Sequence, residues 1–472
     1  SDSYNPSSIL EAVRFLGDYD AVFCNSYYSS DTISHIQSKG SMCYQWEAAL
    51  LEFVKNGAPR TLESYEYSLA SKLDGIHYQI IARQFLRHIT VKLGQKSLPL
   101  LVEYMLQYYN AIIRKHQIMH IICAENPHCF GDYILVGLAA ILDIPCVSIK
   151  YLAQTGRKLS TIYDLIGFKH ISTPSQSVNG NLCPEGAVRD LIEVLRNPTN
   201  PSSPPYLSSV LASYQKELLS GTSSLKSKSS EGFKYNDIIC DISSRKRFIK
   251  NNCYRAEQFN NLMLLCLHYE YESSTCPDAG SEYDQQIFAL SLSQLARKLG
   301  YTILVREHPD QLRGYPGDFE YMHHSYGNTQ TTSRPEYFYH SLLSLPCVAG
   351  FSDASESIND IFISRPGRLI VASLTGSVLL QAACLGIATV SASSHYLHAA
   401  GITYSVLELN EKTSVLSSPL EARIPIVGNN KSIIVDCLSP WLFRSDFIGN
   451  TSVPGSAESF SSLIEHILST NQ

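Results

Sequence analysis

The sequence is poor in charge. Only 17% of its 472 residues are Asp, Glu, Lys or Arg, whereas globular proteins average about 25%. The formal net charge is −6, so the chain lacks the basic excess of a nucleic-acid coat protein or of a polybasic membrane binder. Its apolar content of 44% excludes an intrinsically disordered chain. We therefore expect a folded protein with no nucleic-acid partner.

Long apolar runs and a leader sequence are also missing. No run approaches the ~20 apolar residues that a membrane-spanning helix needs, and residues 1–8, SDSYNPSS, have neither the basic nor the apolar region of a secretory signal. The 13 cysteines form no C-x-x-C pair, and several lie in apolar runs, where a thiol behaves as a small buried hydrophobe. An odd, scattered set is not typical of a disulfide framework or a zinc ribbon. These absences predict a reducing, cytoplasmic location.

The common catalytic and nucleotide-binding motifs are absent. The chain contains no H-E-x-x-H, no Walker lysine loop and no G-x-G-x-x-G. Its 15 histidines show no metal-ligand spacing. We therefore expect neither a bound metal nor a resident cofactor.

Short apolar runs alternate with helix-like segments along most of the chain. The runs are apolar on both faces and often end in a polar residue, which is typical of buried parallel strands. Candidate strands span residues 20–26, 119–125, 144–150, 262–269, 301–307, 368–373 and 387–392, and candidate helices span 98–115, 133–142, 285–299 and 377–385. This alternation predicts doubly wound α/β units that bind ligands at the carboxyl ends of the strands.

A Pro- and Ser-rich stretch interrupts this rhythm near the middle of the chain. Residues 197–209 and 221–232 have little to bury, which indicates an interdomain linker, although a surface loop has the same composition. We predict a Rossmann-like lobe over residues 1–196, a linker over 197–235, a second Rossmann-like lobe over 236–410 and a C-terminal extension over 411–472. Two lobes facing a central cleft can desolvate a ligand, in an enzyme and in a binding protein alike.

The candidate strand at residues 301–307 runs into the sequence Arg-Glu-His-Pro. Pro309 stops the strand, so we expect His308 at its carboxyl end, where an imidazole can donate to a phosphate oxygen. Arg306 adds a positive charge if it faces the same cleft. A His before Pro is often a simple turn residue, and it is the strand-end position that favours ligand binding.

A small-residue turn, Thr375-Gly376-Ser377, joins another strand to an apolar helix. Backbone N–H groups and hydroxyls at a helix N-terminus form an anion site, and Gly376 permits close approach of a ligand to the backbone. Ser373 precedes the turn, and Gln381 lies one helical turn beyond it. The pattern favours binding of a nucleotide phosphate, with simple helix capping as the alternative.

Two further strand ends carry candidate site residues. His268, Glu270 and Glu272 follow the strand at 262–269, and we expect them to bind substrate, unless this polar loop is solvated surface. In the first half, Glu125, His128 and Asp132 surround the turn after the strand at 119–125. Our candidates for a general base on an acceptor hydroxyl are Glu125 and Asp132, and our first-half candidate for substrate binding is His128. Asp132 can equally cap the helix that follows.

Together these segments resemble a family of bacterial capsule and surface-polysaccharide biosynthesis proteins, related to the Kdo transferases of capsule assembly. The resemblance rests on LHYEYE, REHP and LIVASLTGSVLLQ, in that order, and on ENPHCFGDYILVGLAAILDIP in the first half. It covers residues 123–149 and 263–401. Tyr271 and Leu380-Gln381 stand where the family usually has Pro and Trp-Glu. Gln381 keeps the hydrogen-bonding capacity of that Glu but not its charge.

The resemblance implies a metal-independent glycosyltransferase of the GT-B fold that inverts the transferred sugar. It implies that the second lobe binds a nucleotide sugar, with a CMP-linked keto-sugar such as Kdo as the first donor to test. The first lobe would bind an oligosaccharide or lipid-linked glycan, and the protein would associate peripherally with a membrane polysaccharide-export complex. The implied nucleotide-sugar-binding residues are Arg306, His308, Pro309, Ser373, Thr375, Gly376, Ser377 and Gln381. A sugar-nucleotide epimerase, or a non-catalytic glycan- or nucleotide-binding component of a polysaccharide assembly complex, remains open.

Overall fold

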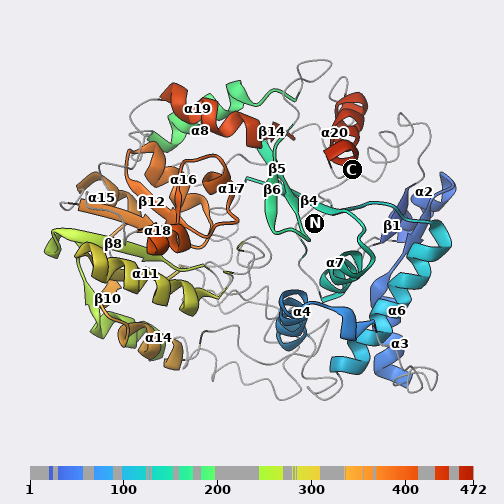
Figure 1. The fold of residues 1–472 in the computed structure, drawn as a ribbon, viewed down its shortest axis with the longest axis horizontal. Coiled ribbons are helices and arrows are strands. Elements are labelled where there is room, and N and C mark those ends of the chain that lie inside the picture. Colours follow the sequence, from blue (N-terminus) through green and yellow to red (C-terminus); the bar gives the residue numbers. More distant parts are fainter. Residues whose placement is uncertain are drawn as a thin grey trace, which may run out of the picture.

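A computed structural model shows two α/β units lying side by side (Figure 1). It describes residues 21–24, 30–56, 69–88, 98–123, 127, 130–152, 159–173, 182–196, 244–268, 279, 282, 284–308, 334, 336–353, 356–364, 368–412, 431–445 and 456–470. The linker predicted over residues 197–235 lies outside these ranges. Among the helices within them, none combines the length and the apolar character that membrane crossing requires.

The larger sheet consists of seven parallel strands. They are β7 (Cys253–Tyr254), β8 (Asn261–Cys266), β9 (Thr302–Arg306), β10 (Val348–Ser352), β11 (Arg368–Ala372), β12 (Ala388–Ser391) and β13 (Tyr404–Ser405). Their order across the sheet is β13-β12-β11-β8-β9-β10-β7. The chain leaves β8 toward β9 and β10, then returns to β11 on the other side of β8. Such a reversal is a topological switch point, where open α/β sheets bind their ligands.

Helices cover both faces of this sheet. Along β8, Leu262, Leu264 and Cys266 belong to the core on one face, while Met263 and Leu265 belong to the core on the other. Successive side chains of a strand point to opposite faces, so a run that is apolar throughout forms a buried strand. The first face is covered by α15 (Ile358–Ser364), α16 (Ser377–Cys384) and α17 (Tyr396–Ala399), and the second by α11 (Gln285–Leu299), α14 (Glu336–Leu343) and α18 (Val406–Lys412). The expected α/β class is confirmed.

The smaller unit contains a mixed sheet. Its strands are β3 (Ile121–Cys123), β4 (Cys146–Tyr151), β5 (Leu159–Asp164), β6 (Lys169–Ile171) and β14 (Phe443–Arg444). β3 and β4 are parallel, whereas β5 runs antiparallel to β4, β6 and β14. A short connection suffices between antiparallel neighbours, so no crossover helix separates β5 from β6. The parallel pattern expected of this lobe therefore holds for β3 and β4 and for the separate pair β1 (Val22–Cys24) and β2 (Met42–Tyr44).

Two C-terminal elements complete the smaller unit. β14 adds a strand next to β5, and α20 (Ser456–Thr470) packs Leu463 and Ile467 against Val147 and Ile149 of β4. α19 (Lys431–Leu438) contacts α8 (Glu185–Arg196), and α8 in turn contacts α16 of the larger unit. The two helices lie together along one edge of the molecule, in green and red (Figure 1). The predicted C-terminal extension thus shares its cores with both units.

Helices of the first half form a third core. They are α3 (Trp46–Asn56), α4 (Gly75–His88), α6 (Leu98–His116) and α7 (Phe130–Leu142), whereas α2 (Ser30–Ser38) buries Ile36 in a separate cluster with Phe23 of β1. α7 contacts both α4 and α6. Trp46 of α3 is fully buried in this core, and its indole lies directly over Gly131 of α7. The absence of a side chain at Gly131 is what allows the close contact between α3 and α7.

Replacing Gly131→Ala should therefore destabilise the protein, because a methyl group there overlaps the Trp46 indole. Overpacking of this kind costs about 1–3 kcal/mol, which urea unfolding measures. The control is Gly186→Ala in α8, where an added methyl group meets nothing within 4 Å. We expect that variant to keep or slightly raise the free energy of unfolding, because Ala is the better helix former. Equal unfolding midpoints for Gly131→Ala and the wild type would contradict the packing.

Candidate functional site

His268 occupies the switch point of the larger sheet. It follows β8 and is only 6% exposed. Its Nε2 lies 3.1 Å from the backbone N of Thr375, 2.6 Å from the backbone O of Thr375 and 3.1 Å from the hydroxyl of Ser373. A proton on Nε2 would bond to the Thr375 carbonyl, whereas a lone pair would accept from the Thr375 N–H. The protonation of one ring nitrogen therefore decides which backbone group of the turn is engaged.

Gly376 is required at this turn for two reasons. Its φ of +110° lies in a region that side chains disfavour. In addition, a Cβ at this position would lie 2.9 Å from Cε1 of His268. Gly376 precedes α16, and no side chain caps the helix there. The polar groups of the turn thus face His268 at the carboxyl edge of the sheet.

A buried network holds the backbone of His268 in place. The amide of Gln285 accepts from the His268 N–H at 2.8 Å, and the guanidinium of Arg334 donates to the His268 carbonyl. Arg334 also forms an ion pair with Glu307, and the side chains of Arg334 and Glu307 are 1% and 2% exposed. This network ties the end of β8 to the end of β9.

Further donors satisfy the Glu307 carboxylate. The Tyr339 hydroxyl donates to it at 2.7 Å and the backbone N–H of His308 at 2.6 Å. Burial, with the charge of Glu307 next to it, raises the pKa of Tyr339 well above its ordinary value. Tyr339 is therefore a neutral hydrogen-bond donor. The backbone of His308 is fixed at the strand end through the same carboxylate.

The structure brings some of the predicted residues together and directs others elsewhere. Ser373, Thr375 and Gly376 surround His268, and Ser377 begins α16 with an exposed side chain. The guanidinium of Arg306, in contrast, donates to Ser352 of β10 at 3.1 Å. Gln381 donates to Asn359 of α15 at 2.6 Å. The predicted residues outside the described ranges are Glu125, His128, Glu270, Glu272 and Pro309.

Asp132 lies in the first turn of α7, on the side of the smaller unit where β1 and α6 pack. Burial raises the pKa of Cys24 to about 12, and the nearby charge of Asp132 adds to this shift. Burial also raises the pKa of Tyr109, and Asp132 again contributes. Asp132 therefore lies near Cys24 and Tyr109, and its role as a general base remains a prediction.

Sequence analysis missed a buried contact between the two units that is formed by His170, His395 and Tyr396 and is called the histidine seam below. His170 of β6 contacts Tyr396 of α17 with ring centroids 5.7 Å apart, and His395 contacts the same tyrosine at 4.6 Å. Both histidines are buried. Burial holds the pKa of each well below its usual range, and the charge of Lys150 lowers both further. Isolated histidines carry no sequence signal, so only the contact between the units reveals this seam.

A second missed group is Glu282, whose buried carboxylate accepts from the backbone N–H and the hydroxyl of Ser393. Ser393 follows β12, so this carboxylate also lies at the carboxyl edge of the larger sheet. Burial raises the pKa of Glu282, and its Oε1 has no hydrogen-bond partner. The edge thus combines an imidazole, backbone N–H groups, hydroxyls and a carboxylate. Within the described part of the chain, no cluster of His, Cys, Asp and Glu is arranged to hold a metal ion.

Arg334→Met should destabilise the protein strongly, because it leaves the Glu307 carboxylate buried without its ion-pair partner. Breaking a buried pair from one side costs about 3–5 kcal/mol, measured by urea unfolding. The double variant Arg334→Met/Glu307→Leu should recover part of the loss. As a control, Glu257→Gln removes an ion pair with Arg255 whose side chains are both 59% exposed, and it should leave the midpoint unchanged. An unchanged midpoint for Arg334→Met would contradict the network.

The histidine seam predicts a loss of stability in mild acid. A histidine with a lowered pKa in the folded state takes up its proton first in the unfolded chain, so stability falls as the pH drops below about 6.5. Each such group lowers the free energy of unfolding by about 1.4 kcal/mol for each pH unit between its unfolded-state and folded-state pKa. His170→Phe should flatten the dependence measured by urea unfolding. His340→Phe, at an exposed position of α14, should not, and equal slopes for the wild type and His170→Phe would refute the assignment.

No family model matches the chain, and no curated protein matches it in sequence. Among solved structures, the chain is similar to the UDP-GlcNAc 2-epimerase of Neisseria meningitidis bound to UDP-GlcNAc, with a TM-score of 0.22 and 12% identity over 92% of this chain and 96% of that one. It is also similar to the UDP-GlcNAc 2-epimerase of Methanocaldococcus jannaschii in complex with UDP-GlcNAc and UDP, with a TM-score of 0.23 and 10% identity over 84% and 96% of the two chains. At these scores neither likeness assigns a family, and the function rests on the site itself.

Proposed function

We propose that the protein is a glycosyltransferase of the GT-B type that binds the phosphate of a nucleotide sugar between β8 and β11. One observation carries the proposal: His268, the Ser373 hydroxyl and the Thr375 N–H meet at the switch point of a parallel sheet. Open α/β sheets bind their ligands at this position. His268, His308 and Thr375 belong to the second-half motifs that carry the resemblance to capsule glycosyltransferases, and they follow β8, β9 and β11.

The turn offers a phosphate a favourable charge. The N-terminus of α16 carries a partial positive charge that favours an anion. The space that a side chain of residue 376 would fill is taken by the His268 ring, so the imidazole lies directly beside the turn. A bound phosphate would replace the contacts between Thr375 and the imidazole. It would accept from the Thr375 N–H, and Nε2 of His268, in the tautomer that carries its proton there, would turn from the Thr375 carbonyl to donate to the same phosphate. These donors would stabilise the negative charge that develops on the departing nucleotide.

The transfer would proceed by direct displacement. The oxygen of an acceptor hydroxyl forms a bond to the anomeric carbon, and the bond from that carbon to the phosphate oxygen breaks, its electron pair leaving with the nucleotide. The hydroxyl proton passes to a carboxylate of the smaller unit, for which Glu125 and Asp132 are the candidates. A CMP-linked keto-sugar is the first donor to test. The acceptor would be an oligosaccharide or a lipid-linked glycan, brought to the cytoplasmic enzyme at a polysaccharide-export complex.

The reaction type follows from a nucleotide-release experiment with CMP-, UDP- and GDP-sugars. Release that requires a glycan acceptor is the expected result and identifies a transferase. Conversion of the donor without an acceptor would identify an epimerase instead. Binding without turnover would identify a non-catalytic component of a polysaccharide assembly complex.

His268→Gln and His308→Ala should each weaken nucleotide-sugar binding about tenfold, because each removes a hydrogen bond to a charged group, worth about 1.5–3 kcal/mol. Isothermal titration of the full chain measures the dissociation constant. His340→Ala, on the exposed side of α14, serves as the matched control and should bind like the wild type. If both site variants retain the affinity of the wild type, the phosphate binds elsewhere.

A further inference from the structure

The smaller unit contains an aspartate–histidine pair at the start of α4. The carboxylate of Asp74 accepts from the backbone N–H of His77 at 2.8 Å and lies 2.7 Å from Nδ1 of its ring. Partial burial raises the pKa of Asp74, but the hydrogen bonds from His77 outweigh it and lower that pKa overall. An ionised Asp74 holds a ring proton on Nδ1, so in the neutral form of the ring Nε2 of His77 presents a lone pair.

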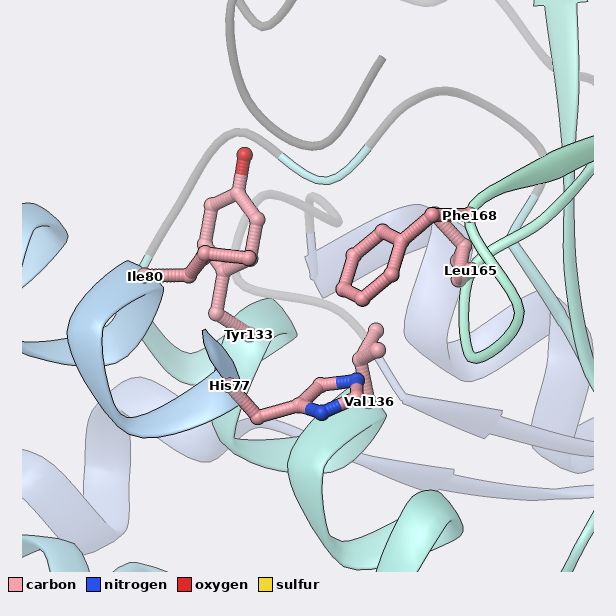
Figure 2. A pocket seen from close by; sticks show the side chains of 6 residues that line it. All are labelled: His77, Ile80, Tyr133, Val136, Leu165 and Phe168. Atoms are coloured by element: carbon pink, nitrogen blue, oxygen red, sulfur yellow. The ribbon is translucent and has the colours of Figure 1, made fainter. Parts of the chain in front are cut away.

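Nε2 of His77 has no hydrogen-bond partner, although His77 is only 4% exposed. The ring forms one wall of a small pocket between α4, α7 and the turn from β5 to β6, which Figure 2 shows from close by. The pocket is lined by His77, Ile80, Tyr133, Val136, Leu165 and Phe168. Its interior volume is about 10 Å³, the room of a single hydroxyl-sized group, and the rest of a ligand would lie in its open mouth. A buried acceptor atom that faces such a space can accept a hydrogen bond from a ligand.

Phe168 covers the histidine from the opposite wall. Its ring lies 5.2 Å from the imidazole of His77, with 30° between the two planes. Phe168 has a φ of +50°, which is rare and energetically unfavourable for a bulky residue. The turn is held by Asp164, whose carboxylate accepts from the backbone N–H groups of residues 166 and 167 at 3.0 Å. The fold thus maintains a disfavoured backbone conformation that keeps an aromatic ring over His77.

The pocket adjoins the seam between the two units. His170 follows Phe168 by two residues on the same hairpin and contacts Tyr396 of the larger unit. In a two-unit transferase, the smaller unit faces its acceptor along this seam. A group bound near His77 would therefore lie on the acceptor side.

The lining distinguishes between types of ligand. Among the described lining residues, Tyr133 already donates its hydroxyl to the backbone carbonyl of Pro127 at 2.9 Å, and the other neighbours of His77 are apolar. A buried water needs about three hydrogen bonds. An anion would find no positive charge among the described lining residues, and a metal cation would find one ligand atom, Nε2 of His77. A hydroxyl on a carbon skeleton needs one acceptor and places its carbon against apolar walls. The chemistry therefore matches a neutral alcohol.

We propose that the pocket formed by Asp74, His77 and Phe168 is a subsite for the hydroxymethyl group of a glycan acceptor, whose hydroxyl donates to Nε2 of His77. Asp74 is a positioning residue that fixes the ring tautomer, and Phe168 packs against the hydroxymethyl carbon. The identity of the ligand as a glycan rests on the proposed glycosyltransferase function. The pocket alone requires that the ligand donate a hydrogen bond and carry an apolar carbon next to the donor.

The test uses the full chain labelled with [15N]histidine and titrated with methyl hexopyranosides, each paired with its 6-deoxy analogue. We expect at least one hexoside to shift the Nε2 resonance of His77 and to bind about fivefold to tenfold more tightly than its 6-deoxy partner, the effect of one hydrogen bond. His77→Phe keeps an aromatic ring beside Phe168 and should abolish this preference. His340→Phe should retain it.

Three results would overturn the subsite: no sugar shifts the resonance, the 6-deoxy analogues bind equally well, or His77→Phe keeps the preference. The urea midpoint of each variant confirms that it is folded. Nucleotide-sugar binding, measured on the same samples, should be unchanged in His77→Phe. If the wild type binds no nucleotide sugar while the His77 resonance still reports the hydroxymethyl group, the proposed function fails and the subsite stands.

Discussion

The buried ion pair between Arg334 and Glu307 is the interaction on which the candidate site depends. Burying two charges is costly and is stabilising only when further hydrogen bonds satisfy both groups. Here Glu307 also accepts from Tyr339 and from the backbone of His308, and Arg334 also donates to the carbonyl of His268. The network therefore sets the backbone positions of His308, which sequence analysis assigned to the nucleotide sugar, and of His268, which it assigned to the substrate.

The larger sheet determines where that network lies. The reversal of strand order between β8 and β11 brings residues 107 positions apart in sequence, His268 and Thr375, into hydrogen-bonding contact. The histidine seam connects the larger unit to the smaller one, because His170 of β6 and His395 both contact Tyr396. The donor side and the acceptor side of the molecule are thus linked through neutral, buried rings.

The two proposed binding regions differ in chemistry, and the ligands proposed for them differ in the same way. At the switch point, backbone N–H groups, the start of α16 and an imidazole favour a phosphate. At His77, a single lone pair among aromatic and aliphatic side chains favours a neutral hydroxyl. A sequence with 29 tyrosines and only 17% charged residues suits both, because neither region relies on exposed charge.

Sequence alone determined β8, β9, β11, β12, α11 and α16 of the larger unit, because buried parallel strands are apolar on both faces and their helices are periodic. The helix predicted over residues 285–299 coincides with α11, and the predicted strands at 301–307 and 368–373 contain β9 and β11. Sequence analysis did not find β7, β10, β13, α14, α15, α17 or α18. It also indicated the turn at Gly376, where the structure shows a positive φ. It did not find β5 and β6, whose short antiparallel pairing leaves a weak pattern.

Only the tertiary structure decided the partners of the polar side chains. Arg306 bonds to Ser352, and Gln381 bonds to Asn359. The places of Arg334, Glu282, His170 and His77 at the sites described were likewise decided by the tertiary structure. The reason is physical: the position and protonation of these polar groups depend on burial and on partners distant in sequence, which periodicity does not encode.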